Sequence, residues 1–479
     1  MRKITKYLVL LIAFMLMSCN KQEAKYVFFF IGDGMGTAHI NAAERYLASV
    51  EGKSGIIKLN LNQTNYTGSA STYSQDQYIT DSGAAGTALA TGHKTSNYTL
   101  SMDAEHIFPY KTIAEHSKDK AMKVGIISSV SLNHSTPAAF YAHQPSKNNY
   151  YEIAKELTVS DLDFFGGGGL RDITDPKGID PGNVVELAKE NNYLYVNSAT
   201  AFKYLEPGAG KVLFIHPDKG KDHALPFAID ASETSISLAD ITDKAIKMLD
   251  NEDGFFIMVE GGKIDWACHH NDAATTIHDI IAFDNAVKVA LDFYEEHKEN
   301  TLIIVTADHE CGGLTLGTAG GDNDLELSKL QWQTNSFVKL TEEYSELKKD
   351  KELLMGADSM QSDSSWAFSF IYEKTALGDE TKGLALDSAE VAELTKAYKR
   401  SFKARDRSNH EEYILYGPYD PFLLKTSHVL SRKVGLGWAT YSHTAIPVPV
   451  RAFGVGAEKF TGYYDNTDIY DKLRDIMKF

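Results

Sequence analysis

The chain has 479 residues, of which 43% are hydrophobic, and its formal net charge at pH 7 is −17. This length and composition suffice for a large buried core, and they exclude a disordered chain. The acidic balance excludes the basic surface typical of nucleic-acid-binding proteins, and a total of 3 cysteines excludes a disulfide-rich scaffold. Because an acidic protein repels anions at long range, an anion site here would need local positive charge, such as a bound metal ion.

Residues 1–18 have the pattern of a secretory signal peptide, with basic residues before an apolar run that ends at Met17. The run is too short to span a bilayer. It leads into Leu16-Met17-Ser18-Cys19, which resembles the lipobox of bacterial lipoproteins. We therefore expect export, a lipid on Cys19 as the only membrane attachment, and a short tether at 19–25. The anchor would hold the protein in the bacterial periplasm or on the outer membrane; ordinary secretion is the alternative.

Apolar runs that end in polar or charged residues recur along the chain. The first, at 25–31, leads into Gly32-Asp33-Gly34 and then into a helical pattern that reaches about Val50. Later runs repeat this arrangement: 124–128 before His134 and Thr136, 255–259 before Glu260, 302–306 before Asp308 and His309, and 437–441 before His443.

Helical patterns at 241–250 and 273–297 lie between these runs. The alternation predicts an α/β fold, with a doubly wound, mainly parallel central sheet that helices cover on both faces. The carboxyl ends of parallel strands meet at one edge of a sheet, and ligands bind beyond it. We therefore expect the polar side chains that follow the runs to gather at that edge.

The alternation stops between about residues 318 and 427, where the sequence becomes polar and charged. Helical patterns at 340–354 and 388–403 fall in this stretch. We interpret it as an insertion before the last strands of a single α/β domain at 26–479, beside the site or at a subunit contact. The glycine run at 166–169 lacks the Lys-Ser/Thr ending of a phosphate-binding loop, so a tight loop at a strand end is expected there.

Small residues dominate the stretch from Tyr78 to Gly92, in which Asp81 and Ser82 precede a helical pattern. Such a helix can bring its N-terminus close to a ligand, and the free N–H groups and dipole at that end favour an anion. Ser82 would stand on the first turn, where its hydroxyl could act as a nucleophile. The alternative is an ordinary N-cap.

Carboxylate and imidazole groups follow two of the predicted strands in pairs. Asp265 and His269 are four residues apart, so on a helix they share one face and can bind one metal ion. Asp308 and His309 follow another apolar run. Together with His443, these pairs indicate a two-metal site of oxygen and nitrogen ligands. A surface ion pair is the alternative for Asp265 and His269.

The order of these motifs resembles that of the alkaline phosphatase family. The resemblance is carried by 31–36, 80–82, 136–139, 259–261, 264–265, 306–309 and 442–444. Each motif is short, but their ordered combination is specific and covers most of the chain outside the insertion. It implies a metal-dependent phosphomonoesterase that converts many phosphate monoesters to alcohol and inorganic phosphate through a phosphoserine at Ser82, and it implies a homodimer.

The resemblance also implies metal ligands, with two Zn²⁺ and one Mg²⁺ in each subunit. These ligands are Asp265, His269 and His443 for the first zinc ion; Asp33, Asp308, His309 and the Ser82 oxygen for the second; and Glu260, Thr136 and the other oxygen of Asp33 for the magnesium ion.

The chain departs from the family pattern at several positions. Lys147 stands where the family usually has an arginine that clamps phosphate, and a lysine offers a point charge in place of a planar fork. A surface role for Lys147 is the alternative. His134 stands where some members have an aspartate near the magnesium ion, and Trp266 where some have a lysine. Because a histidine also suits Zn²⁺ or Co²⁺, the identity of the third metal is open. We expect Asp81, His134 and Trp266 beside the metal ligands rather than among them.

Other functions are weighed against this one. A phosphodiesterase of the same superfamily generally lacks the third metal site, so Glu260 and Thr136 disfavour it. A sulfatase would need a Cys/Ser-x-Pro-x-Arg segment, which the sequence lacks. A non-catalytic lipoprotein that binds phosphate or metal would not need Ser82. Cys268 and Cys311 could form a disulfide, although we expect Cys268 to be a small buried residue.

Overall fold

The computed structural model describes residues 23–180, 182–220, 222–319, 321, 324–404 and 409–479. The predicted signal peptide at 1–18, Cys19 and most of the tether lie outside the described residues. Within the described ranges, no helix is both long enough and apolar enough to cross a membrane.

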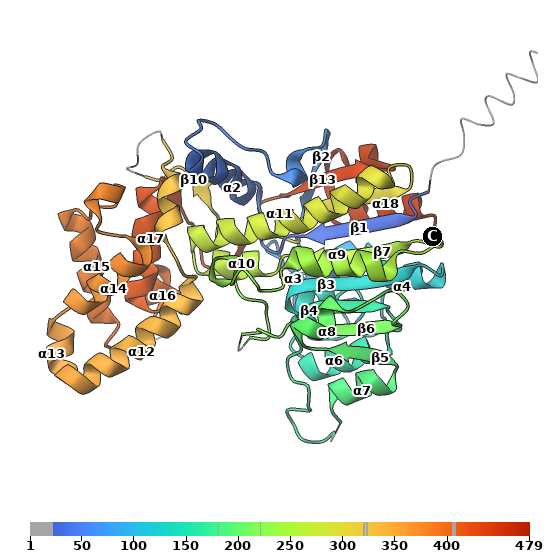
Figure 1. Ribbon diagram of the computed structural model, residues 1–479, viewed down its shortest axis with the longest axis horizontal. Helices are drawn as coiled ribbons and strands as arrows, with labels where there is room; N and C mark the ends of the chain where they lie inside the picture. Colours follow the sequence, from blue (N-terminus) through green and yellow to red (C-terminus); the bar gives the residue numbers. More distant parts are fainter. Residues whose placement is uncertain (1–22, 181, 221, 320, 322–323, 405–408) are drawn as a thin grey trace, which may run out of the picture.

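A ten-stranded sheet forms the centre of the molecule (Figure 1). Its strands are β1 (Tyr26–Ile31), β2 (Tyr66–Ser71), β3 (Lys123–Ser131), β4 (Phe164–Gly169), β5 (Tyr193–Val196), β6 (Lys211–Ile215), β7 (Phe255–Glu260), β8 (Thr301–Thr306), β13 (Val448–Gly454) and β14 (Gly462–Asp465). They lie in the order β14-β2-β13-β8-β1-β7-β3-β4-β6-β5. In this sheet β13 runs antiparallel to β8 and β2, and the other neighbouring pairs are parallel. The predicted mainly parallel sheet is therefore confirmed.

Helices cover both faces of this sheet. Those that precede residue 300 are α2 (Thr37–Val50), α3 (Ser82–Thr91), α4 (Ile113–Asp119), α5 (Ser135–Ala138), α6 (Tyr150–Val159), α7 (Val184–Glu190), α8 (Ala199–Lys203), α9 (Leu238–Leu249), α10 (Lys263–His269) and α11 (Ala273–Glu296). The long helix α11 and α9 cross the front of the sheet in Figure 1. On the other face α3 packs against the last helix, α18 (Thr467–Met477), next to α4.

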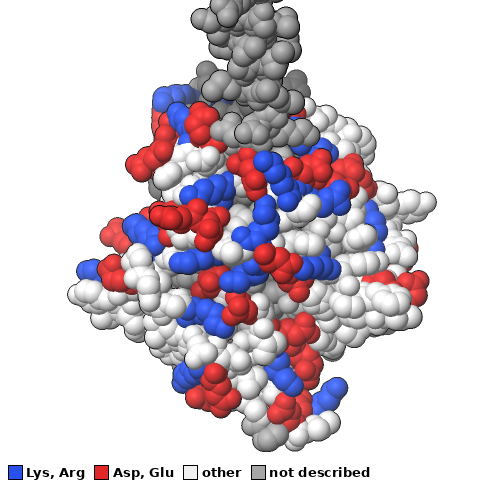
Figure 2. All heavy atoms as spheres, turned by 90° about the vertical axis from the view of Figure 1, so that its right-hand side faces the viewer, with Lys and Arg blue, Asp and Glu red and all other residues white. Residues whose placement is uncertain are grey.

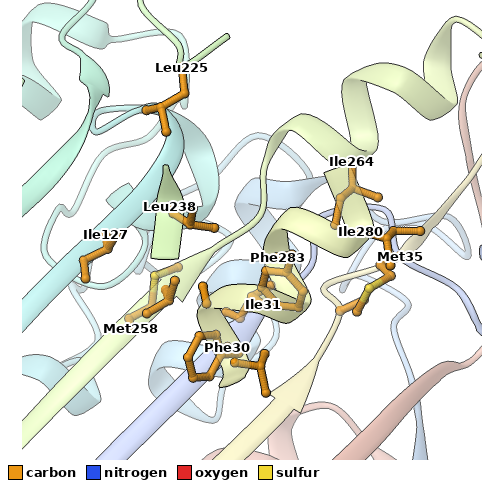
Figure 3. Close-up of a cluster of buried hydrophobic side chains, with 14 of the residues drawn as sticks. Phe30, Ile31, Met35, Ile127, Leu225, Leu238, Met258, Ile264, Ile280 and Phe283 are labelled. Carbon is orange, nitrogen blue, oxygen red and sulfur yellow. The ribbon is translucent and has the colours of Figure 1, made fainter. Parts of the chain in front are cut away.

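The core under α10 and α11 fixes the strand ends that carry the site (Figure 3). Phe30 of β1 is fully buried, and its ring meets that of Phe283 on α11 with centroids 5.8 Å apart. Ile264 of α10 and Ile280 of α11 lie in the same cluster. Burying each such side chain stabilises the fold by roughly 1.5–3 kcal/mol, so α10 is held firmly beside the end of β1.

The predicted insertion is a helical lobe at the left of Figure 1, beyond the carboxyl ends of the strands. It contains α12 (Phe337–Met355), α13 (Ala357–Ser362), α14 (Ser365–Thr375), α15 (Ser388–Arg400), α16 (His410–Tyr416) and α17 (Pro421–Lys433). The predicted helices at 340–354 and 388–403 are confirmed as α12 and α15.

Buried aromatic side chains hold this lobe together, and a ring contact is among those that join it to the rest of the molecule. Tyr344 packs between Trp366 and Phe422, with ring centroids 5.3 and 5.6 Å away. His270, directly after α10, stacks on Phe337 at 4.9 Å. The lobe therefore rests against the helix that carries Asp265 and His269.

Two local predictions were wrong. The glycine run at 166–169 is no loop but belongs to the buried strand β4. Glycine is needed there since the 223–224 segment packs closely against it: a Cβ on Gly168 would lie 2.4 Å from the Ala224 Cα. The run at 437–441 adds no strand to the central sheet. Only β11 (Leu436–Gly437) forms there, pairing with β10 (Thr315–Leu316), and the more apolar β13 takes the place beside β8.

The end of the molecule that carries the amino ends of the strands has a mixed surface (Figure 2). Lys and Arg side chains alternate there with Asp and Glu side chains. Neighbouring opposite charges cancel within a short distance in physiological salt, so this end presents no strong field of one sign.

Candidate active site

The register of the central strands brings the polar residues after them to one edge. Ile31 of β1 lies level with Glu260 of β7 and with Thr306 of β8. Asp33 and Asp308 each follow two residues beyond this level, so they leave the sheet side by side. The polar side chains that follow these strands therefore lie at one edge of the sheet, as the sequence predicted.

Ser82 is the first residue of α3 and faces the same edge. Its Oγ lies 3.2 Å from His309 Nε2, and the residue is 4% exposed. The cap of the helix is Asp81, whose Oδ1 accepts the N–H of Ala84 at 3.1 Å and of Tyr98 at 3.0 Å. Ser82 is therefore not the N-cap, and its hydroxyl is left available for chemistry.

Asp265, His269 and His443 form a first cluster. The Asp265 carboxylate lies 3.2 Å from His269 Nε2 and 3.7 Å from His443 Nε2. Nδ1–H of His269 donates to the Tyr441 carbonyl at 2.6 Å, and Nδ1–H of His443 donates to the Thr80 carbonyl at 2.9 Å. Because a carbonyl can only accept, both rings carry a proton on Nδ1 and direct Nε2 to the cluster.

His443 reaches this cluster on a short strand of a separate two-stranded sheet rather than on a strand of the central sheet. Its strand, β12 (His443–Thr444), pairs with β9 (Glu310–Cys311). The Glu310 carboxylate accepts a hydrogen bond from the Thr444 hydroxyl and from the backbone N–H of Gly313 and Leu314. Glu310 thus fastens β12 to the turn at Gly313 and Leu314.

Asp33, Asp308 and His309 form a second cluster that is fully buried. His309 Nε2 lies 3.5 Å from Asp33 and 3.3 Å from Asp308. Burial and the neighbouring carboxylate of Asp308 raise the pKa of Asp33, and burial raises that of Asp308 to about 7. Such crowding of acids is costly unless a cation lies between them.

Asp33 also belongs to a third cluster, with His134 and Glu260. Burial raises the pKa of Glu260 to about 8 and lowers that of His134 to about 4, so this imidazole is neutral and able to bind a metal. The His134 and Trp266 rings meet edge to face at 5.9 Å. Thr136 is buried on the adjacent short helix α5.

The buried oxygens of these clusters test whether metal ions fit. Both oxygens of Asp33, Oε1 of Glu260, Oδ1 of Asp265 and Oδ2 of Asp308 are buried without a hydrogen-bond donor. Buried acceptors normally have a partner, and a cation would satisfy all of these at once. The oxygen and imidazole donors also suit zinc and magnesium. The residues present therefore fit bound metal.

Lys147 lies at the rim of the site, held by Asp81. Its Nζ is 2.7 Å from the Asp81 carboxylate and lies over the Tyr98 ring, 4.9 Å from the centroid. Burial lowers the pKa of Lys147, but the Asp81 charge outweighs this and raises it overall. The Lys147 charge in turn acts to lower the pKa of His309 and His443, which places this cation beside the clusters.

Sequence reasoning missed one member of the first cluster. Cys311 offers its sulfur within 4.8 Å of the ligand atoms of the other three residues. Cys268 and Cys311 are both buried free thiols, so the disulfide considered for them is absent. The position of Cys311, two residues after the predicted metal-binding pair Asp308 and His309, was the only signal that the sequence offered.

Comparisons with known proteins agree with this geometry. A family model described as Alkaline phosphatase matches residues 24–479. Alkaline phosphatase 3 of Bacillus subtilis is 32% identical over 470 residues, which cover 96% of this chain and 90% of that relative. The alkaline phosphatase of Escherichia coli is 32% identical over 342 residues, covering 61% of this chain and 71% of the relative. The crystal structure of a cold-active alkaline phosphatase from the psychrophile Shewanella sp. has 27% identity and a TM-score of 0.75, covering 94% of this chain and 99% of that one.

The fold, the clusters and these matches define a metal-dependent hydrolase of phosphoric monoesters. The chain belongs to the alkaline phosphatase family. The family resemblance, the fold class and the phosphomonoesterase activity predicted from the sequence are thereby confirmed.

Proposed function

We propose that Ser82 is the nucleophile of this phosphomonoesterase and that a phosphoserine forms on it during each turnover. The observation that carries this proposal is the 3.2 Å separation of Ser82 Oγ and His309 Nε2, at the N-terminus of α3. Free N–H groups at a helix N-terminus favour the negative charge of a phosphoryl group. The Oγ–P bond forms while the bond from phosphorus to the leaving alcohol oxygen breaks, and the proton lost by the Ser82 hydroxyl is balanced by the one that the released alcohol takes up. Water then attacks the phosphoserine and releases inorganic phosphate, which restores the hydroxyl.

We propose three metal positions, which coincide with the three clusters. Asp265, His269 and His443 would hold one Zn²⁺, while Asp33, Asp308 and His309, with the Ser82 oxygen, would hold the other. Bound there, the ions lower the pKa of coordinated hydroxyl groups and water and offset the charge of the phosphoryl oxygens. The unsatisfied buried oxygens in these clusters support this assignment.

The third position would hold Mg²⁺ between Asp33, Glu260 and Thr136. His134 shares a cluster with Asp33 and Glu260, and its nitrogen favours Zn²⁺ or Co²⁺ over Mg²⁺, which prefers oxygen ligands. Ser128 Oγ donates a hydrogen bond to Glu260 and orients its carboxylate. Trp266 packs on His134 and would limit its movement.

Lys147 would bind the phosphoryl group as a point charge. Its ammonium is already 2.7 Å from Asp81, so it meets the substrate in a fixed direction. One cation gives a weaker and less oriented hold than the two parallel hydrogen bonds of a guanidinium. If the site recognises only the phosphoryl group, it does not discriminate between the alcohols attached to it. We therefore infer a broad range of monoester substrates.

We further propose that the protein is exported, is anchored by a lipid on Cys19 and acts as a homodimer. Large apolar side chains are exposed near the site, namely Tyr78, Ile79, Ile107 and Phe108. Exposed apolar groups of this kind favour a protein interface.

Acid trapping tests the nucleophile. The metal-loaded protein is mixed with a phosphate monoester and quenched in acid, and its peptides are analysed by mass spectrometry. We expect phosphate on the peptide that contains Ser82, and none in Ser82→Ala. Ser69→Ala is the matched control, since Ser69 Oγ donates to the Val448 carbonyl within the sheet. Phosphate on another residue would contradict the proposal, and binding without turnover of any ester would favour a phosphate-binding lipoprotein.

A further inference from the structure

Cys311 occupies a position in the first cluster that the proposed mechanism does not use. Its sulfur and the ligand atoms of Asp265, His269 and His443 all lie within 4.8 Å of one another. In the pairing of β9 with β12, Cys311 stands directly opposite His443. The thiol therefore reaches the cluster from the strand paired with that of His443.

Close packing fixes the thiol in this position. Cys311 is fully buried, its N–H donates to the Gly34 carbonyl at 3.0 Å, and its sulfur lies 3.8 Å from the Asp265 carbonyl. A Cβ added to Gly34 would come within 2.9 Å of both the Cys311 Cβ and Asp265 Oδ1. Gly34 has φ of 72°, a conformation that glycine adopts readily. The turn after β1 thus allows Cys311 and Asp265 to press together.

A second observation points to a ligand at this place. Asp265 Oδ1 is buried and accepts no hydrogen bond, although it faces the same cluster. The other buried thiol, Cys268, provides a contrast, because its sulfur lies 3.8 Å from the Thr276 hydroxyl and it joins no cluster of metal-binding groups among the described residues.

We propose that Cys311 is a fourth protein ligand of the site formed by Asp265, His269 and His443, and that a thiophilic divalent ion such as Cd²⁺ takes all four. This inference rests on the proposed function, which assigns the other three residues to a metal. Thiolate sulfur favours such soft ions. Zinc–sulfur and zinc–nitrogen bonds of about 2.3 and 2.1 Å place two tetrahedral ligands about 3.6 Å apart, so ligand atoms near the 4.8 Å limit would have to approach by about 1 Å.

Binding would release the thiol proton to water as the sulfur–metal bond forms, without a change of oxidation state. An ion held by four protein ligands has no open position for water or phosphate. The four-ligand form is therefore closed to substrate, and Cys311 makes the enzyme sensitive to thiophilic metals.

Ultraviolet absorption tests the proposal directly. All proteins carry Cys19→Ser, so that Cys268 and Cys311 are the only thiols left. Metal-free full-length protein is titrated with Cd²⁺, and the absorption band of a thiolate bound to Cd²⁺ is recorded. We expect the band to appear and to saturate, to vanish in Cys311→Ser, and to persist in Cys268→Ser. We also expect Cys311→Ser to lower Cd²⁺ affinity by about tenfold or more, since a soft ligand is lost. Thermal unfolding confirms that each variant is folded.

Equilibrium dialysis distinguishes the ways in which the proposal can fail. Cd²⁺ retained in stoichiometric amount without a thiolate band, while Zn²⁺-loaded protein still phosphorylates Ser82, would overturn the Cys311 assignment alone. A band that survives Cys311→Ser and disappears in Cys268→Ser would overturn it as well. Failure to retain either Cd²⁺ or Zn²⁺ would overturn the metal site itself, and with it the proposed function.

Discussion

The ammonium of Lys147 lies 2.7 Å from the carboxylate of Asp81, the residue that caps the helix beginning with Ser82. The same carboxylate therefore caps the helix of the proposed nucleophile and orients the Lys147 ammonium. Burial raises the pKa of Asp81, but the Lys147 charge outweighs this and lowers it overall, so the pair stays charged at working pH.

Replacing this cation should affect the binding of substrate and phosphate more than the rate of the chemical step. We expect Lys147→Ala to raise KM and the phosphate inhibition constant about tenfold, and Lys147→Arg to lower both, because an arginine adds a second parallel hydrogen bond. Steady-state kinetics with phosphate as inhibitor measures both constants. Lys118→Ala is the control, since Lys118 pairs with Asp163 at 2.9 Å, away from the clusters. Unchanged constants in Lys147→Arg would argue that Lys147 is a surface residue.

Removal of metal should make stability depend on pH. Burial raises the pKa of Glu260 from 4.5 to about 8 and of Asp308 from 3.8 to about 7, so the folded metal-free protein binds more protons than the unfolded chain. The contribution of these two carboxyl groups to the free energy of unfolding is then fully present below about pH 4. It is lost as the pH rises toward 8. Zinc at 100 times its dissociation constant should restore about 2.7 kcal/mol per site. Melting temperatures at pH 5 and 8, with chelator or with zinc, test this; equal pH dependence in both would contradict it.

Glu310 should control the first proposed metal site through β12, the short strand that carries His443. Its carboxylate joins Thr444 to the backbone of Gly313 and Leu314. We expect Glu310→Gln to weaken zinc binding about 10- to 100-fold, since a residue that positions a ligand is altered. Zinc competition with a fluorescent chelator measures the affinity. Glu326→Gln is the control, because that exposed residue pairs only with Lys329 in the structure described; equal affinities in the two variants would refute the role.

His143 offers a pH prediction away from the site. It lies 3.5 Å from Glu115 and 3.8 Å from Glu156. Burial lowers its pKa, but the two carboxylates outweigh this and raise it from 6.5 to about 10. Its contribution to stability is thus complete below pH 6.5 and disappears as pH rises through about 10. We expect His143→Gln to cost about 2 kcal/mol at pH 6 and little above pH 10. Urea unfolding at both pH values checks this, and an equal loss at both would contradict it.

The sequence predicted the parts of the fold that depend on local pattern. The strands β1, β7 and β8 are buried on both faces, so they read as continuous apolar runs, and polar residues at their ends meet because parallel strands share a direction. The separation of four residues in one helix likewise predicts that Asp265 and His269 share a face. Those residues lie together in the structure as expected, while their metal-binding roles stay predictions.

The features that the sequence could not indicate depend on contacts between distant segments. Ser82 and His309 are 227 residues apart, and Glu310 reaches Thr444 across 134 residues. The pairing of β12 with β9 and the placement of Cys311 accompany that second contact. The glycines of β4 were predicted wrongly for a different reason. Glycine has no side chain, so this part of the strand shows no apolar pattern.

The most direct test compares Ser82→Ala with the parent protein, both loaded with zinc and magnesium after chelation. Hydrolysis of a chromogenic phosphate monoester is measured beside a phosphodiester and a sulfate ester. The account predicts monoesterase activity that returns with the metals and falls by about a thousandfold or more in Ser82→Ala. Monoesterase activity that survives in the variant, or a phosphodiesterase rate that exceeds it in the parent, would contradict the account.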